Sequence, residues 1–325
     1  MFCTDTASDL AKLAEALRAG QLVAIPTETV YGLAASALDE AACRRIFEVK
    51  GRPLLDPLIV HVPDRAAGER LARFDGRAVR LAEAFWPGPL TLVLPKRAAV
   101  PAIVTAGKPT VALRSPAHPA ARRLLAAAGI PLAAPSANPF GYISPTTAQH
   151  VAESLGTRIP WILDGGPCSV GIESTIVALA PDRPARILRP GSISREELSE
   201  ALGEAVEAAP EEAKSGAAVE APGMLARHYS PATPAVLFAH GALPAARRGE
   251  AAVFQHRREH ALDGIEGSSV FWFSESGDPA DTARNLYALL RRLDSLGFTR
   301  IHIERAAHSP LGDTINDRLR RAATG

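Results

Sequence analysis

The stretch KGRPLLDPLIVH, residues 50–61, joins a cationic turn to an apolar strand. Gly51 and Pro53 break a helix at the turn that carries Lys50 and Arg52, and the apolar run that follows is typical of a buried strand. A loop with two cations next to a strand suits a phosphate-bearing ligand. The alternative is a solvated turn in front of a core strand, and this stretch by itself favours neither.

The composition is that of a globular protein with one large domain or two. The chain has 325 residues, 47% of them apolar and 22% charged, and its 27 prolines and 25 glycines predict many ordered loops. The formal net charge is only +1, so the chain lacks the overall basic field that drives non-specific nucleic-acid binding. Any RNA contact is therefore expected to be a local patch.

The cysteines and the N-terminus bear on the compartment. Cys3, Cys43 and Cys168 are far apart and match no zinc-binding or CxxC spacing, which favours reduced thiols in a cytoplasmic protein. The N-terminus has no basic segment followed by an apolar one, and no apolar stretch approaches ~18 residues. We therefore expect no export, no membrane contact, no disulfide and no metal ligand from cysteine.

Polar side chains recur where predicted strands end. Short apolar runs predict strands at 22–25, 58–60, 90–94, 110–114, 161–164, 176–179 and 185–188, between helices at 8–19, 39–49, 119–128, from 147 and at 194–202. This alternation predicts an α/β fold, in which ligands bind at strand ends. The polar residues near these ends are Thr29, Lys50, Arg52, His61, Arg114, Ser136, Asn138, Ser144, Ser174 and Arg189.

Each of these residues also has a structural explanation. The hydroxyl groups around Thr29 can cap a following helix, and Arg114 can form an ordinary surface salt bridge. Taken together, however, the set brings cations and hydroxyls to one edge without a nucleophilic cysteine, paired carboxylates or a Ser-His-Asp order. A site of this kind binds anions and holds them in line, as phosphoryl and nucleotidyl transfer require.

Several common motifs are absent. Gly166 and Gly171 have the glycine spacing of a phosphate loop, but Ile172 stands where that motif needs lysine, and no GxGxxG occurs. His256 and His260 have metal-ligand spacing for a helix, but no glutamate follows His256 and no third ligand is evident. Surface histidines are the favoured interpretation, and no protein metal site is predicted.

A second domain follows a change in composition. Residues 203–219 are rich in Glu, Ala, Lys and Gly without an apolar period, which is typical of a solvated linker. Beyond it, strands at 236–238, 252–254, 270–273 and 301–303 and helices at 280–296 and 314–322 predict a smaller α/β domain. The predicted division is 1–205, a linker at 206–234, and 235–325.

Nine motifs together resemble one family. PTETVYGLAA, KGRP, PLIVHV, PGPLTLVLPK, VALRSP, APSAN, ESTIV and LRPGSIS resemble the YrdC/Sua5 family of L-threonylcarbamoyladenylate synthases, and PGMLARHYSP with the C-terminal domain resembles its longer Sua5 form. The resemblance implies a twisted mixed-sheet YrdC-like domain with a concave cavity, plus a smaller Rossmann-like α/β C-terminal domain. It also implies a nucleotidyltransferase that joins L-threonine, bicarbonate and ATP, with Mg²⁺, into threonylcarbamoyl-AMP and diphosphate. That product would feed a tRNA threonylcarbamoyl transferase complex that modifies adenosine 37.

The resemblance also implies residue roles. By motif position, threonine binds at Thr29, His61, Arg114 and Ser174. The nucleotide binds at Lys50, Arg52, Asp56, Thr110, Ala134, Ser136, Asn138, Ser144, Arg189 and Tyr229, with Lys50 and Arg52 as catalytic cations. Asp56 replaces the asparagine common in the family, and a carboxylate there would either repel phosphate or recruit Mg²⁺.

Two other functions are compatible with parts of the sequence, and one segment has a further predicted role. An RNA-binding module would use the cationic surface without catalysis, although the net charge of +1 weighs against it. A carbamoyltransferase-type module would need zinc-finger and acylphosphatase-like segments that this sequence lacks. Residues 222–231, which include Met224, Arg227, His228 and Tyr229, are predicted to cover the active site rather than act as a passive tether.

Overall fold

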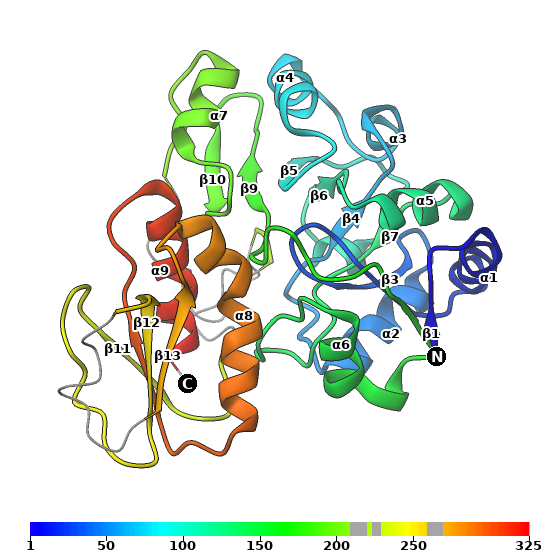
Figure 1. Ribbon diagram of the computed structural model, residues 1–325. Helices are drawn as coiled ribbons and strands as arrows, with labels where there is room; N and C mark the ends of the chain where they lie inside the picture. The colour runs from blue at the N-terminus through cyan, green and yellow to red at the C-terminus, as the bar shows by residue number, and fades with distance from the viewer. Residues whose placement is uncertain (209–219, 223–228, 259–268, 325) are drawn as a thin grey trace. The chain divides into compact units, whose positions relative to one another are not determined.

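The chain forms two compact units in the computed structural model (Figure 1). The structure describes residues 1–208, 220–222, 229–258 and 269–324. Unit 1 comprises Met1–Phe140, Pro145–Ser169 and Glu173–Leu225, and unit 2 comprises Gly141–Ser144, Val170–Ile172 and Ala226–Gly325. Two short segments, Gly141–Ser144 and Val170–Ile172, therefore group with the C-terminal residues although unit 1 surrounds them in the sequence.

Unit 1 is built on a mixed sheet of ten strands in the order β1-β8-β2-β3-β7-β4-β6-β5-β9-β10. The β4–β6 and β5–β9 pairs are parallel, whereas β2–β3 and β5–β6 are antiparallel. The strands are β1 (Phe2–Cys3), β2 (Val23–Ile25), β3 (Gly32–Ser36), β4 (Ile59–His61), β5 (Leu90–Pro95), β6 (Thr110–Arg114), β7 (Leu132–Ala133), β8 (Trp161–Leu163), β9 (Thr175–Ala178) and β10 (Arg186–Arg189). The predicted mixed α/β fold is confirmed.

Helices cover both faces of this sheet. They are α1 (Ala7–Arg18), α2 (Glu40–Lys50), α3 (Arg65–Glu69), α4 (Gly76–Phe85), α5 (Pro119–Ala128), α6 (Ala148–Leu155) and α7 (Arg195–Leu202), with 3₁₀ turns η1 (Ala102–Thr105) and η2 (Gly156–Arg158). Val23 and Ile25 of β2 join the core cluster with α1 and α5, whereas Ala24 between them joins the cluster with α2, α4 and α6. Successive strand residues point to opposite faces, so the sheet has a core on each side.

Local sequence sets where the helices begin and end. Asp39 accepts hydrogen bonds from the first amides of α2, and Ser194 and Glu197 form the predicted capping box of α7. α2 ends at Gly51, whose φ of 65° is left-handed. Lys50 was expected on the turn, but it is the last residue of α2, because Gly51 rather than Lys50 leaves the helical conformation.

Unit 2 has a second, fully parallel sheet in the order β11-β14-β12-β13. Its elements are β11 (Ala235–Phe238), β12 (Ala251–His256), β13 (Ser269–Ser274), α8 (Pro279–Ser295), β14 (Ile301–Glu304) and α9 (Pro310–Ala322). This confirms that the C-terminal part of the chain has an α/β fold, as expected. The helical spacing considered for His256 is wrong, because His256 is the last residue of a strand; His260 lies outside the described residues.

Two further features bear on the sequence-based expectations. Cys3, Cys43 and Cys168 are free and buried. In the described parts of the chain, no helix combines the length and apolar character needed to cross a membrane. The division at residues 205 and 234 stays a prediction.

We predict that Gly191 tolerates no side chain. A Cβ there would lie 2.3 Å from the backbone nitrogen of Thr175 and 2.6 Å from its Oγ1, so Gly191→Ala should lower the free energy of unfolding by about 1–3 kcal/mol through overpacking. Urea denaturation measures the change. Gly76→Ala is the matched control, because a Cβ there would lie 3.8 Å from Nη1 of Arg80, an ordinary van der Waals contact. Equal midpoints for the two variants would contradict the prediction.

Candidate functional site

The pairing of β4 with β6 places His61 beside Arg114. The two strands run parallel with His61 and Arg114 as register partners, and both are the last residues of their strands. Both side chains are buried. The sequence prediction that these strand ends meet is therefore confirmed.

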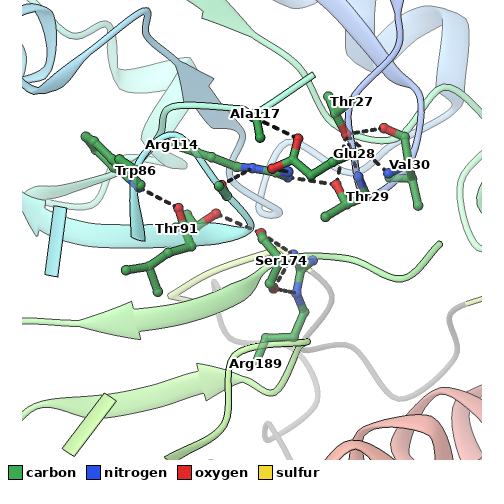
Figure 2. Close-up of polar contacts among 12 residues, drawn as sticks. Thr27, Glu28, Thr29, Val30, Trp86, Thr91, Arg114, Ala117, Ser174 and Arg189 are labelled. Atoms are coloured by element: carbon green, nitrogen blue, oxygen red, sulfur yellow. Dashed lines mark hydrogen bonds and ion pairs between the residues drawn. The ribbon is translucent and has the colours of Figure 1, made fainter. Parts of the chain in front are cut away.

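Arg114 is held by the loop that follows β2 (Figure 2). Its Nη2 lies 2.7 Å from Oε1 of Glu28, its Nη1 donates to Oγ1 of Thr29 at 2.8 Å, and its Nε donates to the carbonyl of Gly88 at 3.3 Å. The surface salt bridge considered for Arg114 is wrong, because the partner Glu28 is buried with it. A buried guanidinium at a strand end can bind a carboxylate ligand.

Thr27 shapes the loop that carries Glu28 and Thr29. Its Oγ1 accepts hydrogen bonds from the amides of Thr29 and Val30, each at 3.2 Å, and donates to the carbonyl of Val30 at 2.6 Å. The chain then continues into β3 rather than a helix, so the helix-capping explanation of these hydroxyls is wrong. Thr27 closes the turn, which leaves the hydroxyl of Thr29 directed at Arg114.

His61 is neutral at physiological pH. Burial, followed by the nearby charge of Arg114, lowers the pKa of His61 to about 3. Within the described residues, nothing hydrogen-bonds to its Nδ1, which is buried. A buried polar atom of this kind is usually satisfied by a ligand or water, so His61 offers a neutral polar group beside Arg114.

Ser174 and Arg189 form a second cluster at β9 and β10 (Figure 2). Ser174 precedes β9, and its Oγ lies 2.8 Å from Oγ1 of Thr91. Arg189 ends β10, and its Nη2 donates to the carbonyl and the hydroxyl of Ser174 at 3.0 and 3.1 Å. Its Nη1 donates to the carbonyl of Pro222 at 3.3 Å.

Lys50 is tied to the loop that carries Ser136 and Asn138. Its Nζ donates to the backbone carbonyls of both residues, to Ser136 at 2.6 Å. Burial, followed by the charge of Arg52, lowers the pKa of Lys50 well below its ordinary value. An incoming anion would reverse this effect and favour the charged amine.

Arg52 and Asp56 form a buried ion pair on the turn after α2. Nη2 of Arg52 lies 2.9 Å from Oδ1 of Asp56, and Arg52 also donates to the carbonyls of Asp56 and Pro57. Burial raises the pKa of Asp56, opposed by the charges of Arg52, Lys50 and Arg189. These cations therefore lie close enough to share one electrostatic site.

The remaining predicted residues divide between the units. Thr110 begins β6, Ala134 is hydrogen-bonded to Ile59, and Ser136 pairs with Gly32. Ser144 and Tyr229 belong to unit 2. There Arg291 donates to the carbonyl of Ser144 at 3.3 Å, and Tyr229 packs on Tyr287 and Arg318. Met224, Arg227 and His228 lie outside the described residues, so the covering segment stays a prediction.

Two partners in the site were missed from the sequence. Glu28 pairs with Arg114, and Thr91 bonds to Ser174. Glu28 lies in the same hydroxyl-rich run as Thr29, just past a strand end, and that position was a usable signal. Thr91 looks like an ordinary strand residue, and nothing in the sequence pattern singled it out.

Other candidate features do not coincide with this site. A cavity of about 420 Å³ in unit 1 is lined by none of the predicted site residues; its walls include Leu38, Val62, Leu71 and Leu125. No group of three or more His, Cys, Asp or Glu side chains that could hold a metal occurs among the residues with described positions.

The burial of His61 predicts a pH-dependent stability. Because its folded pKa of about 3 lies below the unfolded value of ~6.5, His61 contributes stability above pH ~6.5 that is lost as the pH falls toward 3. The loss approaches about 1.4 kcal/mol per pH unit. His61→Gln should therefore show a shallower decline in unfolding free energy between pH 6.5 and 5, measured in urea. Parallel curves for the two proteins would contradict this.

Two protein-family models match most of the chain. A model of the Sua5, YciO and YrdC proteins, described as "Telomere recombination", matches residues 15–191. A second model, described as "Threonylcarbamoyl-AMP synthase, C-terminal domain", matches residues 193–324. The two matches follow one another and together leave few residues uncovered.

Full-length relatives and solved structures agree with these models. Threonylcarbamoyl-AMP synthase of Pyrococcus abyssi is 42% identical over 94% of this chain and 92% of its own length; that of Bacillus subtilis is 39% identical over 97% and 93%. The crystal structure of P. abyssi Sua5 complexed with L-threonine covers 100% of this chain and 98% of its own, with a TM-score of 0.89 and 37% identity. Escherichia coli YciO, at 22% identity and a TM-score of 0.55 over 61% of this chain and 98% of its own, shares the fold. The chain therefore belongs to the Sua5/YciO/YrdC family and carries the additional Sua5 C-terminal domain.

Proposed function

We propose that this protein is a nucleotidyltransferase that converts L-threonine, bicarbonate and ATP into threonylcarbamoyl-AMP and diphosphate. The observation that carries the proposal is the similarity over the whole chain to P. abyssi Sua5, whose crystal structure contains L-threonine. The buried Arg114, which lies at a strand end beside a neutral His61, supports it, because an amino acid brings a carboxylate that needs such a partner.

Threonine is assigned to the β4–β6 edge of unit 1. Arg114 would bind its carboxylate, and Thr29 and Ser174 would offer hydroxyl groups within reach of the same cluster. Nδ1 of His61 would meet a polar group of the ligand. The support is that all four side chains are buried and that Thr29 already contacts Arg114.

ATP is assigned to the cations beside the threonine site. Lys50 and Arg52 would contact phosphate oxygens and act catalytically through their charge, with Arg189 nearby. The other residues assigned to the nucleotide are Asp56, Thr110, Ala134, Ser136, Asn138, Ser144 and Tyr229. Asp56 is paired with Arg52, so its charge is partly offset before phosphate arrives. A protonated Lys50 has three N–H groups, and its two carbonyl contacts among the described residues leave one for a ligand.

Magnesium would enter with the nucleotide. Mg²⁺ commonly keeps several waters and is held by substrate phosphates and one or two carboxylates. Asp56 is the carboxylate that lies among the proposed phosphate-binding cations, and it fits such a partial ligand set. When bound, Mg²⁺ would offset charge on the phosphates.

The proposed reaction needs positioning and electrostatics rather than a covalent enzyme intermediate. The amine of threonine and bicarbonate form a carbamate with loss of water. A carbamate oxygen then bonds to the α-phosphorus of ATP while the bond to the departing diphosphate breaks. Arg114 would hold the threonine end, and Lys50 and Arg52 would offset the charge that moves onto the diphosphate.

The product has a mixed carbamic–phosphoric anhydride bond and is an activated acyl donor. We propose that it feeds a tRNA threonylcarbamoyl transferase complex that modifies adenosine 37. With a net charge of +1, the protein itself is not expected to hold tRNA tightly. The acceptor tRNA would therefore be bound chiefly by that complex.

Diphosphate release should require both small substrates. Because the carbamate is the nucleophile, omission of L-threonine or of bicarbonate should leave only background release from ATP. A coupled diphosphate assay in bicarbonate-depleted buffer measures this. Equal release with and without threonine would identify a plain ATPase and overturn the proposal.

Substitution of two arginines should affect different ligands. Arg52→Ala should weaken ATP binding and Arg114→Ala should weaken threonine binding, each by the ~1.5–3 kcal/mol of a charge-assisted hydrogen bond. Calorimetry with each ligand measures both effects, and Arg44→Ala, at an exposed position of α2, is the control for loss of a cation. Normal binding of both ligands by both folded variants would show that the residue assignment is wrong.

A further inference from the structure

Glu28 is the buried counter-charge of Arg114. Its Oε1 lies 2.7 Å from Nη2 of Arg114, and its Oε2 accepts a hydrogen bond from the amide of Ala117 at 3.0 Å. Burial by itself would raise the pKa of Glu28, but the charge and hydrogen bond of Arg114 lower it overall. The carboxylate is therefore ionised at neutral pH, and the pair carries no net charge.

Arg114 keeps hydrogen-bonding capacity despite these contacts. A guanidinium has five N–H groups, and the contacts to Gly88, Thr29 and Glu28 occupy three of them. Within the described parts of the chain, one N–H of Nη1 and one of Nη2 are left without a contact, so Arg114 can still donate to a ligand carboxylate. The site can thus accept a ligand carboxylate while Glu28 stays in place.

The charge balance decides which carboxylates are accepted. A ligand with only a carboxylate would leave one uncompensated negative charge among buried groups, and burial of an unpaired charge is costly. A zwitterionic amino acid adds a positive ammonium together with its carboxylate and leaves the cluster neutral. Thr29 and the neutral His61, which lie beside Arg114, supply no compensating charge. The other cation near the proposed threonine site is Arg189, which donates to the hydroxyl of Ser174 and is assigned to the phosphates of ATP.

We propose that Glu28 is a specificity-determining residue that makes this site select an amino acid over the corresponding hydroxy acid. Arg114 takes the carboxylate, and Glu28 supplies the negative charge that an ammonium group must have nearby. The inference rests on the proposed binding of threonine at Arg114 and adds a role for a residue outside the predicted set. Glu28 would attract the ammonium group of the amino acid, and its negative charge would disfavour a hydroxy acid, which has a carboxylate but no ammonium group.

A purely structural role of Glu28 makes a different prediction. If Glu28 only orients Arg114 and anchors Ala117, its replacement should weaken every carboxylate ligand alike. If Glu28 selects by charge, its replacement should weaken the amino acid and leave or improve binding of the hydroxy acid, because Arg114 then lacks its counter-charge. The ratio of the two affinities therefore separates the two roles.

The experiment measures binding of L-threonine and of 2,3-dihydroxybutanoate, in which a hydroxyl replaces the amine, to the full-length protein by calorimetry. The wild-type protein should bind threonine at least tenfold more tightly. Glu28→Gln keeps the shape and the acceptor for Ala117, and it should reduce this ratio at least tenfold. Glu28→Asp should restore part of it, and the affinity for ATP should change less than twofold.

Glu15→Gln is the matched control for the loss of one carboxylate, because Glu15 is exposed on α1. If folded Glu28→Gln shows the wild-type ratio of threonine affinity to hydroxy-acid affinity, the inference is overturned. It is also overturned if the wild-type protein binds the hydroxy acid as tightly as threonine. Failure of the proposed function is distinct, because wild-type protein would then release no threonine-dependent diphosphate. If the wild-type protein releases diphosphate with threonine but Glu28→Gln leaves the affinity ratio unchanged, only the proposed role of Glu28 is refuted and the proposed function stands.

Discussion

The parallel pairing of β4 with β6 is the interaction on which the site depends. It sets His61 opposite Arg114 and brings the ends of two strands to the loop after β2. A slip of one residue in this register would turn every side chain of β4 to the other face. The burial of Val60 and Leu113 in the core opposes such a slip, so the hydrophobic core and the site geometry are fixed by the same pairing.

Burial of charge is the second constraint. Lys50, Arg52, Arg114 and Arg189 are each only 3–6% exposed, and a buried cation is costly unless it is paired or hydrogen-bonded. The protein offsets this cost with two carboxylates, Glu28 and Asp56, and with backbone carbonyls. Because these cations are buried, each interacts more strongly with an anionic ligand than an exposed cation would.

The C-terminal residues hold part of the predicted nucleotide-binding set. Gly141–Ser144 clusters with unit 2, where Tyr142 donates to Asp294 at 2.7 Å and Arg291 donates to the carbonyls of Ile143 and Ser144. α8 therefore fixes the backbone that carries Ser144. A domain that appeared in sequence only as an appended α/β unit contributes structure to a loop from the first half of the chain.

The sequence alone determined the features that depend on near neighbours. Helix caps such as Asp39 and the Ser194 capping box, the stop at Gly51, and most strand positions follow from residues within four positions of each other. The motifs that resemble the Sua5 family, and with them Thr29, His61, Arg114 and Ser174 as candidate residues, were also readable from the sequence. Their strand-end positions follow from the same local patterns.

Only the tertiary structure decided which distant side chains meet. Arg114 contacts Thr29 across 85 positions in the sequence, and its pairing with Glu28 depends on strand order rather than on any local pattern. The i, i+4 spacing of His256 and His260 would suit metal ligands only on a helix, whereas pairing with β13 and β14 makes the segment that ends at His256 a strand. The propensity of single residues for helix or strand contributes little free energy compared with burial of a whole sheet. The contacts between distant strands are therefore fixed only when the hydrophobic core forms.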